Sequence, residues 1–279
     1  MLAECNGCGH ITVTLAHEIH TGYAMSNIGT ALQLYTVREL TAKNFAAAIE
    51  EVARIGFKAV ELAGFGSVRS AREVRKVLDA NGVKAIASHT ALELLERNPN
   101  RVMDDNDALG NKNLVVPYLA EDRREDAAGW RNVANILTRI AQTVQARGFQ
   151  LAYHNHAFEF TPLEEGKRGI DILWENTDPA LVRSELDTFW VKHGGEDPVA
   201  YIQKLGPRIL LLHVKDMAQG EEHRFAPVGT GLLDFASILK ACGDLGVQWA
   251  IVEQDTTYET PPLEAARISL ENLRKLGLS

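Results

Sequence analysis

Residues Leu151–Phe160 read LAYHNHAFEF, an apolar stretch that runs into His154 and His156, with Glu159 just beyond. A short apolar run of this kind predicts a buried strand. Imidazole and carboxylate groups at its end would stand at the mouth of a pocket. Three later segments have the same form, SELDTF, LLLHVKD and AIVEQD, and they end around Asp187, His213 and Glu253. The chain therefore repeats one pattern four times, an apolar strand followed by a histidine or an acid.

Strands and helices are predicted to alternate from Thr30 to the end of the chain. Short apolar runs predict strands at 31–35, 59–62, 83–88, 113–117, 149–154, 182–187, 209–213 and 249–253. Apolar residues at helical spacing predict helices at 45–55, 68–80, 101–109, 126–146, 169–176, 198–205, 235–245 and 263–276. Eight such units in 279 residues predict an α/β fold, a (β/α)8 TIM barrel in a single domain. The alternative is an open doubly wound sheet, but no GxGxxG motif follows a strand.

A barrel would bring the four strand ends together, because the C-terminal ends of its strands meet at one face. The predicted metal ligands are His154, Asp187, His213 and Glu253. Two imidazoles and two carboxylates suit Mn, Zn, Co or Fe better than they suit the all-oxygen cages of Ca²⁺ or Mg²⁺. Each residue alone has another explanation, since a strand-end histidine is commonly structural and Asp187 could cap a helix. Their recurrence on four consecutive strands favours one divalent metal ion.

Further polar and aromatic groups stand near the same strand ends. The candidate substrate-binding residues are Glu61, His89, His156 and Trp190. For Glu61 the alternative role is to orient a metal ligand or His89. Lys215 and Glu159 are candidates for proton transfer, because a nearby ion can shift a pKa toward neutrality. A local ion pair with Asp216 is the alternative for Lys215. Val228–Gly231 (VGTG) is a weak candidate for a phosphate cradle, since G-x-G alone is common.

The charge and cysteine content exclude several classes of partner. The net charge of -8 disfavours nucleic acid and anionic membranes, because phosphate binding depends on clustered Lys and Arg. No apolar run approaches the roughly 20 residues that cross a bilayer. Three cysteines are too few for a disulfide framework, which predicts a reducing, cytoplasmic setting. A homo-oligomer is left open.

Residues 1–27 are predicted to be a loose extension that contributes no strand to the barrel. The segment CNGCGH (Cys5–His10) suggests zinc, but a structural zinc site needs four ligands and a second ligand pair is missing. We therefore expect the barrel, residues 28–279, to fold without this extension.

Eight segments carry a resemblance to a known family. In chain order they are LQLYTVRE, VELAGFG, ASHT, LAYHNHAFEF, ELDTFWVKHGGEDP, RILLLHVKDM, VGTGLLDF and AIVEQD. From Ile28 to the C-terminus this order resembles the sugar phosphate isomerase/epimerase family of the xylose isomerase-like TIM barrels. The resemblance implies one divalent ion held by Asp187, His213 and Glu253 together with a residue of the fifth strand. His154 stands there in the place of a ketose epimerase Glu.

The resemblance implies a metal-dependent isomerase or epimerase of a small sugar or polyol. Such an enzyme acts by enolisation next to a metal-bound carbonyl, and Glu253 is the expected base. Ketose epimerases use two opposed carboxylates, so the change to His154 means that Glu159 or Lys215 would supply the second proton. The same change leaves an inosose dehydratase-like enzyme, or a lyase that cleaves 3-keto-glycosides by β-elimination, as the alternative.

Two other functional classes use the same kind of barrel. A DNA-repair endonuclease would need a trinuclear zinc site and a basic groove, which the net charge of -8 opposes. A non-catalytic sugar-binding protein would not need Lys215 and Glu159 beside intact metal ligands.

Overall fold

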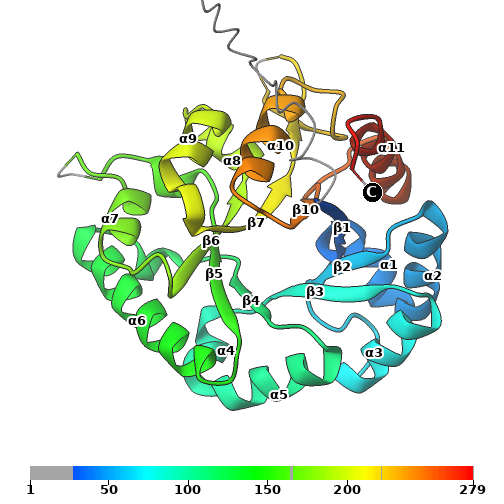
Figure 1. The fold of residues 1–279 in the computed structure, drawn as a ribbon, viewed down its shortest axis with the longest axis horizontal. Coiled ribbons are helices and arrows are strands. Elements are labelled where there is room, and N and C mark those ends of the chain that lie inside the picture. The colour runs from blue at the N-terminus through cyan, green and yellow to red at the C-terminus, as the bar shows by residue number, and fades with distance from the viewer. Residues whose placement is uncertain (1–27, 164–165, 221, 279) are drawn as a thin grey trace, which may run out of the picture.

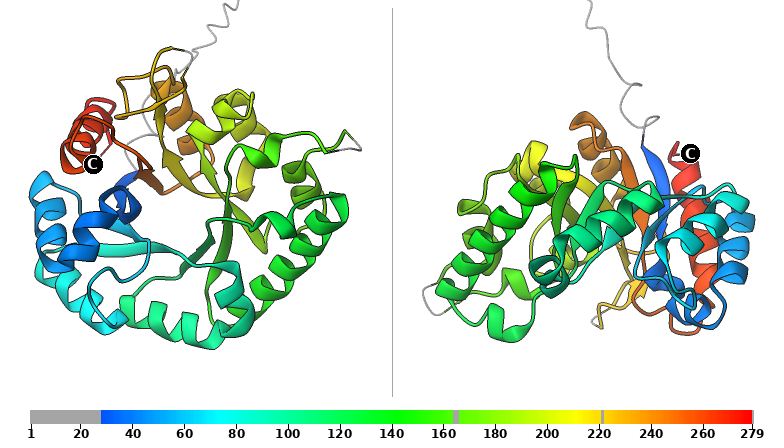
Figure 2. Two further views of the ribbon diagram at one scale, coloured as in Figure 1. Left: turned by 180° about the vertical axis from the view of Figure 1, so that it is seen from behind. Right: turned by 90° about the horizontal axis from the view of Figure 1, so that it is seen from below.

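A closed barrel of parallel strands surrounded by helices forms the centre of the molecule (Figures 1 and 2). The structure, a computed structural model, describes residues 28–163, 166–220 and 222–278. Around the barrel the strands pair in the order β1, β10, β7, β6, β5, β4, β3, β2 and back to β1. The barrel strands are β1 (Gly29–Gln33), β2 (Ala59–Leu62), β3 (Lys84–His89), β4 (Asn113–Val116), β5 (Gln150–His154), β6 (Val182–Asp187), β7 (Ile209–Val214) and β10 (Trp249–Val252). The predicted single-domain TIM barrel is confirmed, and the predicted extension at 1–27 lies outside the described residues.

The α-helices lie outside the barrel. They are α1 (Arg38–Lys43), α2 (Phe45–Ile55), α3 (Ala71–Ala80), α4 (Leu92–Arg97), α5 (Pro99–Leu109), α6 (Ala127–Gln145), α7 (Gly169–Glu175), α8 (Thr188–His193), α9 (Pro198–Leu205), α10 (Phe235–Asp244) and α11 (Pro262–Lys275). The eight predicted helices are all present, with ends that differ by three residues or fewer. The helices α1, α4 and α8 were not predicted. Each has six residues, too few for a helical period to repeat.

Two details differ from the predicted strands. The first strand was expected at 31–35 but ends at Gln33, whose side chain accepts a hydrogen bond from Tyr35 N (3.1 Å) and starts a 3-10 turn, η1 (Leu34–Val37). A short antiparallel hairpin of β8 (Asp216–Met217) and β9 (Phe225–Ala226) follows β7. Because it leaves the end of β7, this hairpin projects at the C-terminal end of the barrel (Figure 2).

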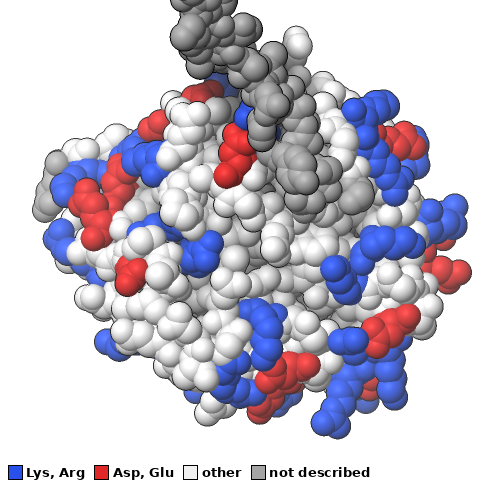
Figure 3. All heavy atoms as spheres, viewed as in Figure 1, with Lys and Arg blue, Asp and Glu red and all other residues white. Residues whose placement is uncertain are grey.

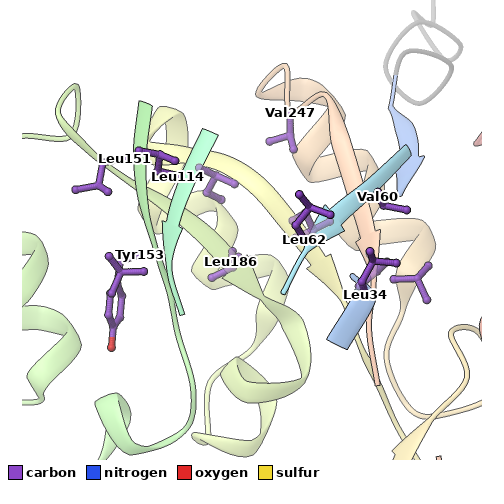
Figure 4. Close-up of a cluster of buried hydrophobic side chains, with 14 of the residues drawn as sticks. Leu34, Val60, Leu62, Leu114, Leu151, Tyr153, Leu186 and Val247 are labelled. Carbon is purple, nitrogen blue, oxygen red and sulfur yellow. The ribbon is translucent and has the colours of Figure 1, made fainter. Parts of the chain in front are cut away.

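The apolar core has two layers, because successive strand residues point to opposite faces. Outward-pointing residues such as Val60, Leu114, Leu151 and Leu186 are buried beneath the helices (Figure 4). The second cluster is smaller and consists of Ala31, Ala59, Ile86, Ala87, Val115, Ala152, Leu211 and Ile251, with Ile86 next to Ala87 because the register between β2 and β3 shifts there. Four of these eight residues are alanine, and the others are branched aliphatic residues of the kind that fill the interior of TIM barrels.

On the face drawn in Figure 3, Lys and Arg alternate with Asp and Glu around the rim and form no continuous basic field. Within residues 28–163, 166–220 and 222–278, no helix has both the length and the apolar character that a membrane span requires.

Candidate metal centre

The inner lining of the barrel changes from apolar to polar within two residues along the strands. Residues two apart on a strand point the same way, and on five strands an apolar residue of the interior is followed by a polar one on the same side. The pairs are Ala59 and Glu61, Ala87 and His89, Ala152 and His154, Leu211 and His213, and Ile251 and Glu253. The polar members lie toward the C-terminal strand ends, where active sites of TIM barrels are found.

The predicted metal ligands lie together in one buried cluster, called here the outer cluster. It consists of His154, Asp187, His213 and Glu253, and its ligand atoms all lie within 4.8 Å of one another. His154 Nε2 is 3.6 Å from Asp187 Oδ2. His213 Nδ1 is 3.0 Å from Glu253 Oε2. The barrel thus converts four distant strand ends into one site.

Asp187 uses its two carboxylate oxygens for different purposes. Its Oδ1 accepts a hydrogen bond from Trp190 N (2.9 Å) and caps α8, which confirms the helix-cap explanation of this residue. Its buried Oδ2 has no hydrogen-bond partner, although Lys215 Nζ lies 3.2 Å away. A buried carboxylate oxygen without a hydrogen bond is unfavourable. A divalent cation would satisfy it, and two imidazoles with two carboxylates fit Zn, Mn, Co or Fe.

Glu185 is a residue of the site that was not predicted from the sequence. Its Oε2 lies 2.8 Å from His89 Nε2, 2.9 Å from His154 Nδ1 and 3.1 Å from His213 Nε2. Glu185 stands two residues before Asp187 on β6 and therefore faces the same side of the strand. That alternation was the sequence signal that could have identified it.

The predicted substrate-binding residue Glu61 lies beneath the outer cluster. Its Oε2 is 2.7 Å from His213 Nε2 and 3.5 Å from His89 Nε2. This placement matches the alternative role, orientation of a metal ligand. Burial and the neighbouring Glu185 raise the pKa of Glu61 to about 7. Burial lowers the pKa of His154 to about 3, which keeps the ring neutral as metal binding requires.

Lys215 is a buried cation among three carboxylates, with 1% of its surface exposed. Its Nζ lies 3.0 Å from Glu253 Oε2, 3.2 Å from Asp187 Oδ2, and 3.0 and 3.1 Å from the two oxygens of Asp255. Burial alone would lower the pKa of Lys215, but the three carboxylates outweigh it and raise the pKa. Lys215 is therefore held as an ammonium by its carboxylate partners and is not a base. Asp255 was not predicted, although it follows Glu253 by two residues.

Asp216 points away from Lys215 toward the VGTG loop. Its carboxylate accepts backbone hydrogen bonds of 2.8 to 3.1 Å from Met217, Gly229, Gly231 and Leu233. The N–H groups of both loop glycines, which a phosphate cradle would need, are therefore already bonded to the protein's own carboxylate.

We expect the Asp216→Ala variant to lose at least about 3 kcal/mol of unfolding free energy, because four backbone N–H groups lose a charged acceptor. Urea denaturation followed by circular dichroism measures this loss. The matched control is Asp234→Ala, which removes an exposed cap of α10 and should lose only about 1 kcal/mol. Equal losses in the two variants would show that Asp216 is an ordinary cap.

Glu159 is the predicted catalytic residue that the structure does not bring to the cluster. Its Oε1 accepts a hydrogen bond from Tyr153 Oη (2.7 Å), and its Oε2 accepts one from His156 N (2.8 Å). Tyr153 belongs to the outward apolar layer of β5, so Glu159 lies behind the strand. Its contacts shape the loop that presents His156.

Burial raises the pKa of Glu159 to about 7 from an ordinary value of 4.5. The folded protein therefore favours the protonated carboxyl, and stability is lost as pH rises from 4.5 to 7 while the unfolded chain ionises. The Glu159→Gln variant cannot ionise. We expect it to match the wild type below pH 4.5 and to exceed its unfolding free energy by on the order of 3 kcal/mol above pH 7. Denaturation curves across this range test the expectation, and parallel pH profiles would contradict it.

A pocket of about 540 Å³ opens beside the outer cluster. Its lining residues are Tyr35, Ala63, Gly64, His89, Pro117, Tyr118, His154, His156, Glu253 and Asp255. The lining includes two predicted metal ligands and the predicted substrate-binding residues His89 and His156. Tyr35 and Tyr118, which were not predicted, add aromatic faces that are 42% and 49% exposed.

Trp190 stands beside this pocket rather than in its wall. Its ring centroid lies 5.4 Å from that of His156, and Lys215 Nζ lies 5.4 Å from the Trp190 ring. The structure thus places Trp190 behind a residue of the lining, where it packs His156 and covers Lys215.

Comparison with known proteins agrees with this geometry. Residues 49–276 match the family model described as xylose isomerase-like TIM barrel. The chain belongs to this family. The resemblance recognised in the sequence is therefore confirmed, and the polar strand ends described above occupy the active-site end of a xylose isomerase-like barrel.

Individual relatives of this xylose isomerase-like barrel are more distant. An inosose dehydratase of Lacticaseibacillus casei is 29% identical over 210 residues, which are 67% of this chain and 63% of that protein. The chain thus spans less than two thirds of that relative's length.

Solved structures resemble the chain in fold. A sugar phosphate isomerase/epimerase from Parabacteroides distasonis ATCC 8503 has a TM-score of 0.76 at 22% identity, covering 90% of this chain and 94% of its own. The structure of the IOLI protein with a bound zinc atom has a TM-score of 0.70 at 15% identity. The similarity covers 90% of this chain and 98% of the IOLI chain.

Proposed function

We propose that this protein is a divalent-metal-dependent dehydratase of a keto sugar or keto polyol. The observation that carries the proposal is the position of Glu253, which belongs both to the outer cluster and to the pocket wall. A substrate in the pocket would therefore lie against a carboxylate at the metal centre. The similarity to a protein named inosose dehydratase supports the same reaction class.

His154, Asp187, His213 and Glu253 would hold the ion. When bound, a divalent ion polarises a carbonyl group and makes the neighbouring C–H more acidic. Glu253 would accept that proton. Burial would raise the pKa of Glu253, but the Lys215 ammonium outweighs it and holds the pKa well below the ordinary value, so the carboxylate is ionised at neutral pH.

Dehydration also requires a proton donor for the departing hydroxyl group. Lys215 is an ammonium 3.0 Å from Glu253 Oε2, so donor and base stand next to each other. In the proposed step a C–H bond breaks with its proton passing to Glu253. The electron pair of that bond forms a C=C bond as the C–O bond at the adjacent carbon breaks, and the departing hydroxyl group takes a proton from Lys215 and leaves as water. The proton on Glu253 then passes to Lys215 across their 3.0 Å contact and restores both groups. Asp187 and Asp255 hold the ammonium in place.

A metal-dependent isomerase or epimerase is the second candidate, and Asp255 is the observation that favours it. Asp255 adds a second carboxylate to the pocket wall, although Lys215 donates to both of its oxygens. The neutral His154, where ketose epimerases have Glu, makes dehydration the better-supported reaction.

The pocket chemistry favours an unphosphorylated substrate. None of the ten residues that line the pocket is Lys or Arg, whereas Glu253 and Asp255 are carboxylates. Phosphate groups are bound by cationic side chains or by unpaired backbone N–H groups. Lys215 is already neutralised by its carboxylate partners, so we propose an uncharged sugar or polyol ketone.

The test is to load the purified protein separately with Zn, Mn, Co and Fe and to incubate it in deuterium oxide with inososes, ketoses and 3-keto-glycosides. Dehydration yields a product that has lost one water molecule. Isomerisation yields an isomer of the substrate in which deuterium from the solvent has replaced one hydrogen. Release of the aglycone would identify the β-eliminating lyase. Absence of deuterium exchange with all substrates, in protein shown to contain metal, would reject the enolising function altogether.

A further inference from the structure

Among the described residues, two four-residue clusters have ligand atoms close enough to hold a cation, and they share two histidines. The outer cluster is His154, Asp187, His213 and Glu253, and the inner cluster is His89, His154, Glu185 and His213. The outer cluster faces His154 Nε2 and His213 Nδ1. The inner cluster faces the opposite nitrogens, His154 Nδ1 and His213 Nε2. A neutral imidazole has one lone pair, so each shared ring can serve only one cluster at a time.

We propose that Glu185 is a positioning residue that fixes both shared rings in the tautomers that serve the outer cluster. Its Oε2 lies 2.9 Å from His154 Nδ1 and 3.1 Å from His213 Nε2. A ring that donates its N–H to this oxygen keeps its lone pair on the other nitrogen. Those other nitrogens face Asp187 and Glu253. The inference rests on the metal centre of the proposed function and names a residue that shapes it without binding the ion.

The surroundings of Glu185 indicate an acceptor of hydrogen bonds rather than a metal ligand. Its Oε2 also lies 2.8 Å from His89 Nε2, so ring nitrogens approach this one oxygen from three sides. Its Oε1 is buried without a hydrogen-bond partner. Carboxylates that accept the second N–H of a ligating histidine fix its tautomer and ring orientation in many metal sites.

Glu61 provides a matched comparison on the other side of the same network. Its Oε2 lies 2.7 Å from His213 Nε2, so the His213 ring has two carboxylate acceptors. At His154 Nδ1 the carboxylate is Glu185. Loss of Glu185 should therefore disturb His154 more than His213, and loss of Glu61 should disturb His213 but not His154.

The zinc-loaded, ¹⁵N-labelled wild-type protein tests the inference directly by two-bond ¹H–¹⁵N correlation spectra of the histidine rings. We expect zinc on His154 Nε2 and His213 Nδ1, with protons on His154 Nδ1 and His213 Nε2. Zinc on the opposite nitrogens would overturn the proposal, because the inner cluster would then be the site and Glu185 a ligand. This readout needs no substrate and no variant.

Variants then separate positioning from general stability. In Glu185→Met, zinc affinity measured by chelator competition should fall about 10- to 100-fold, and His154 should lose its single tautomer. Glu185→Gln keeps an acceptor oxygen and should retain the wild-type tautomers. Glu61→Met should leave the His154 signals unchanged.

Failure of the inference can be told apart from failure of the proposed function. A wild type that binds no zinc or other divalent metal overturns both. A wild type that binds zinc, with Glu185 variants that equal it in affinity and tautomers, overturns only the role of Glu185.

Discussion

Replacement of Asp187 by asparagine is expected to lower the affinity for a divalent metal ion by a factor of roughly 10² to 10³. The binding free energy of a structural zinc site with four ligands is about 10 to 16 kcal/mol, so one ligand contributes about 2.5 to 4 kcal/mol. The asparagine Oδ1 can still cap α8 through Trp190 N, which would turn the amide NH2 toward the ion. The barrel should therefore stay folded, and Asp187→Ala should lose stoichiometric metal entirely.

Metal content after dialysis and competition with a chromophoric chelator measure this effect. The matched control is Asp255→Asn, which also removes a carboxylate from Lys215 but lies outside the outer cluster. Its metal affinity should stay within a few-fold of the wild type. Full metal occupancy in the Asp187→Ala variant would show that Asp187 is not a metal ligand.

Substitution of Glu253 by glutamine is expected to slow substrate deuterium exchange by a factor on the order of 10² to 10⁴, as for loss of a general base. The amide oxygen can still coordinate a metal ion, while the basic oxygen in the pocket wall is lost. Lys215 would keep its contacts with Asp187 and Asp255, so the local fold should be preserved.

Metal content must be measured in the same samples, because lower occupancy would also reduce the rate. Exchange at the wild-type rate in metal-loaded Glu253→Gln would assign the base to another group at the pocket. Lys215→Met gives a further distinction. It should abolish dehydration yet still exchange deuterium, since the first proton transfer does not require the donor to the departing hydroxyl group.

The barrel could be predicted from the sequence because its signals are local. A strand of apolar residues followed by a polar one, and a helix with apolar residues at its own spacing, are both visible within about ten residues. The barrel topology then brings the polar strand ends together, because parallel barrel strands all end at the same face. For this reason the sequence alone predicts that His154, Asp187, His213 and Glu253 lie together, although the first and the last are 99 positions apart.

The partners of each side chain were decided only by the tertiary structure. Glu185 bonds to His89, which is 96 positions away, and Lys215 bonds to Asp255, which is 40 positions away. Glu159 follows His156 by only three residues, yet it turns behind the strand to Tyr153. Burial and hydrogen bonding depend on which neighbours the closed barrel supplies, and no linear spacing encodes those neighbours. The sequence by itself determined which strand ends carry the chemistry, and the packing decided which groups touch.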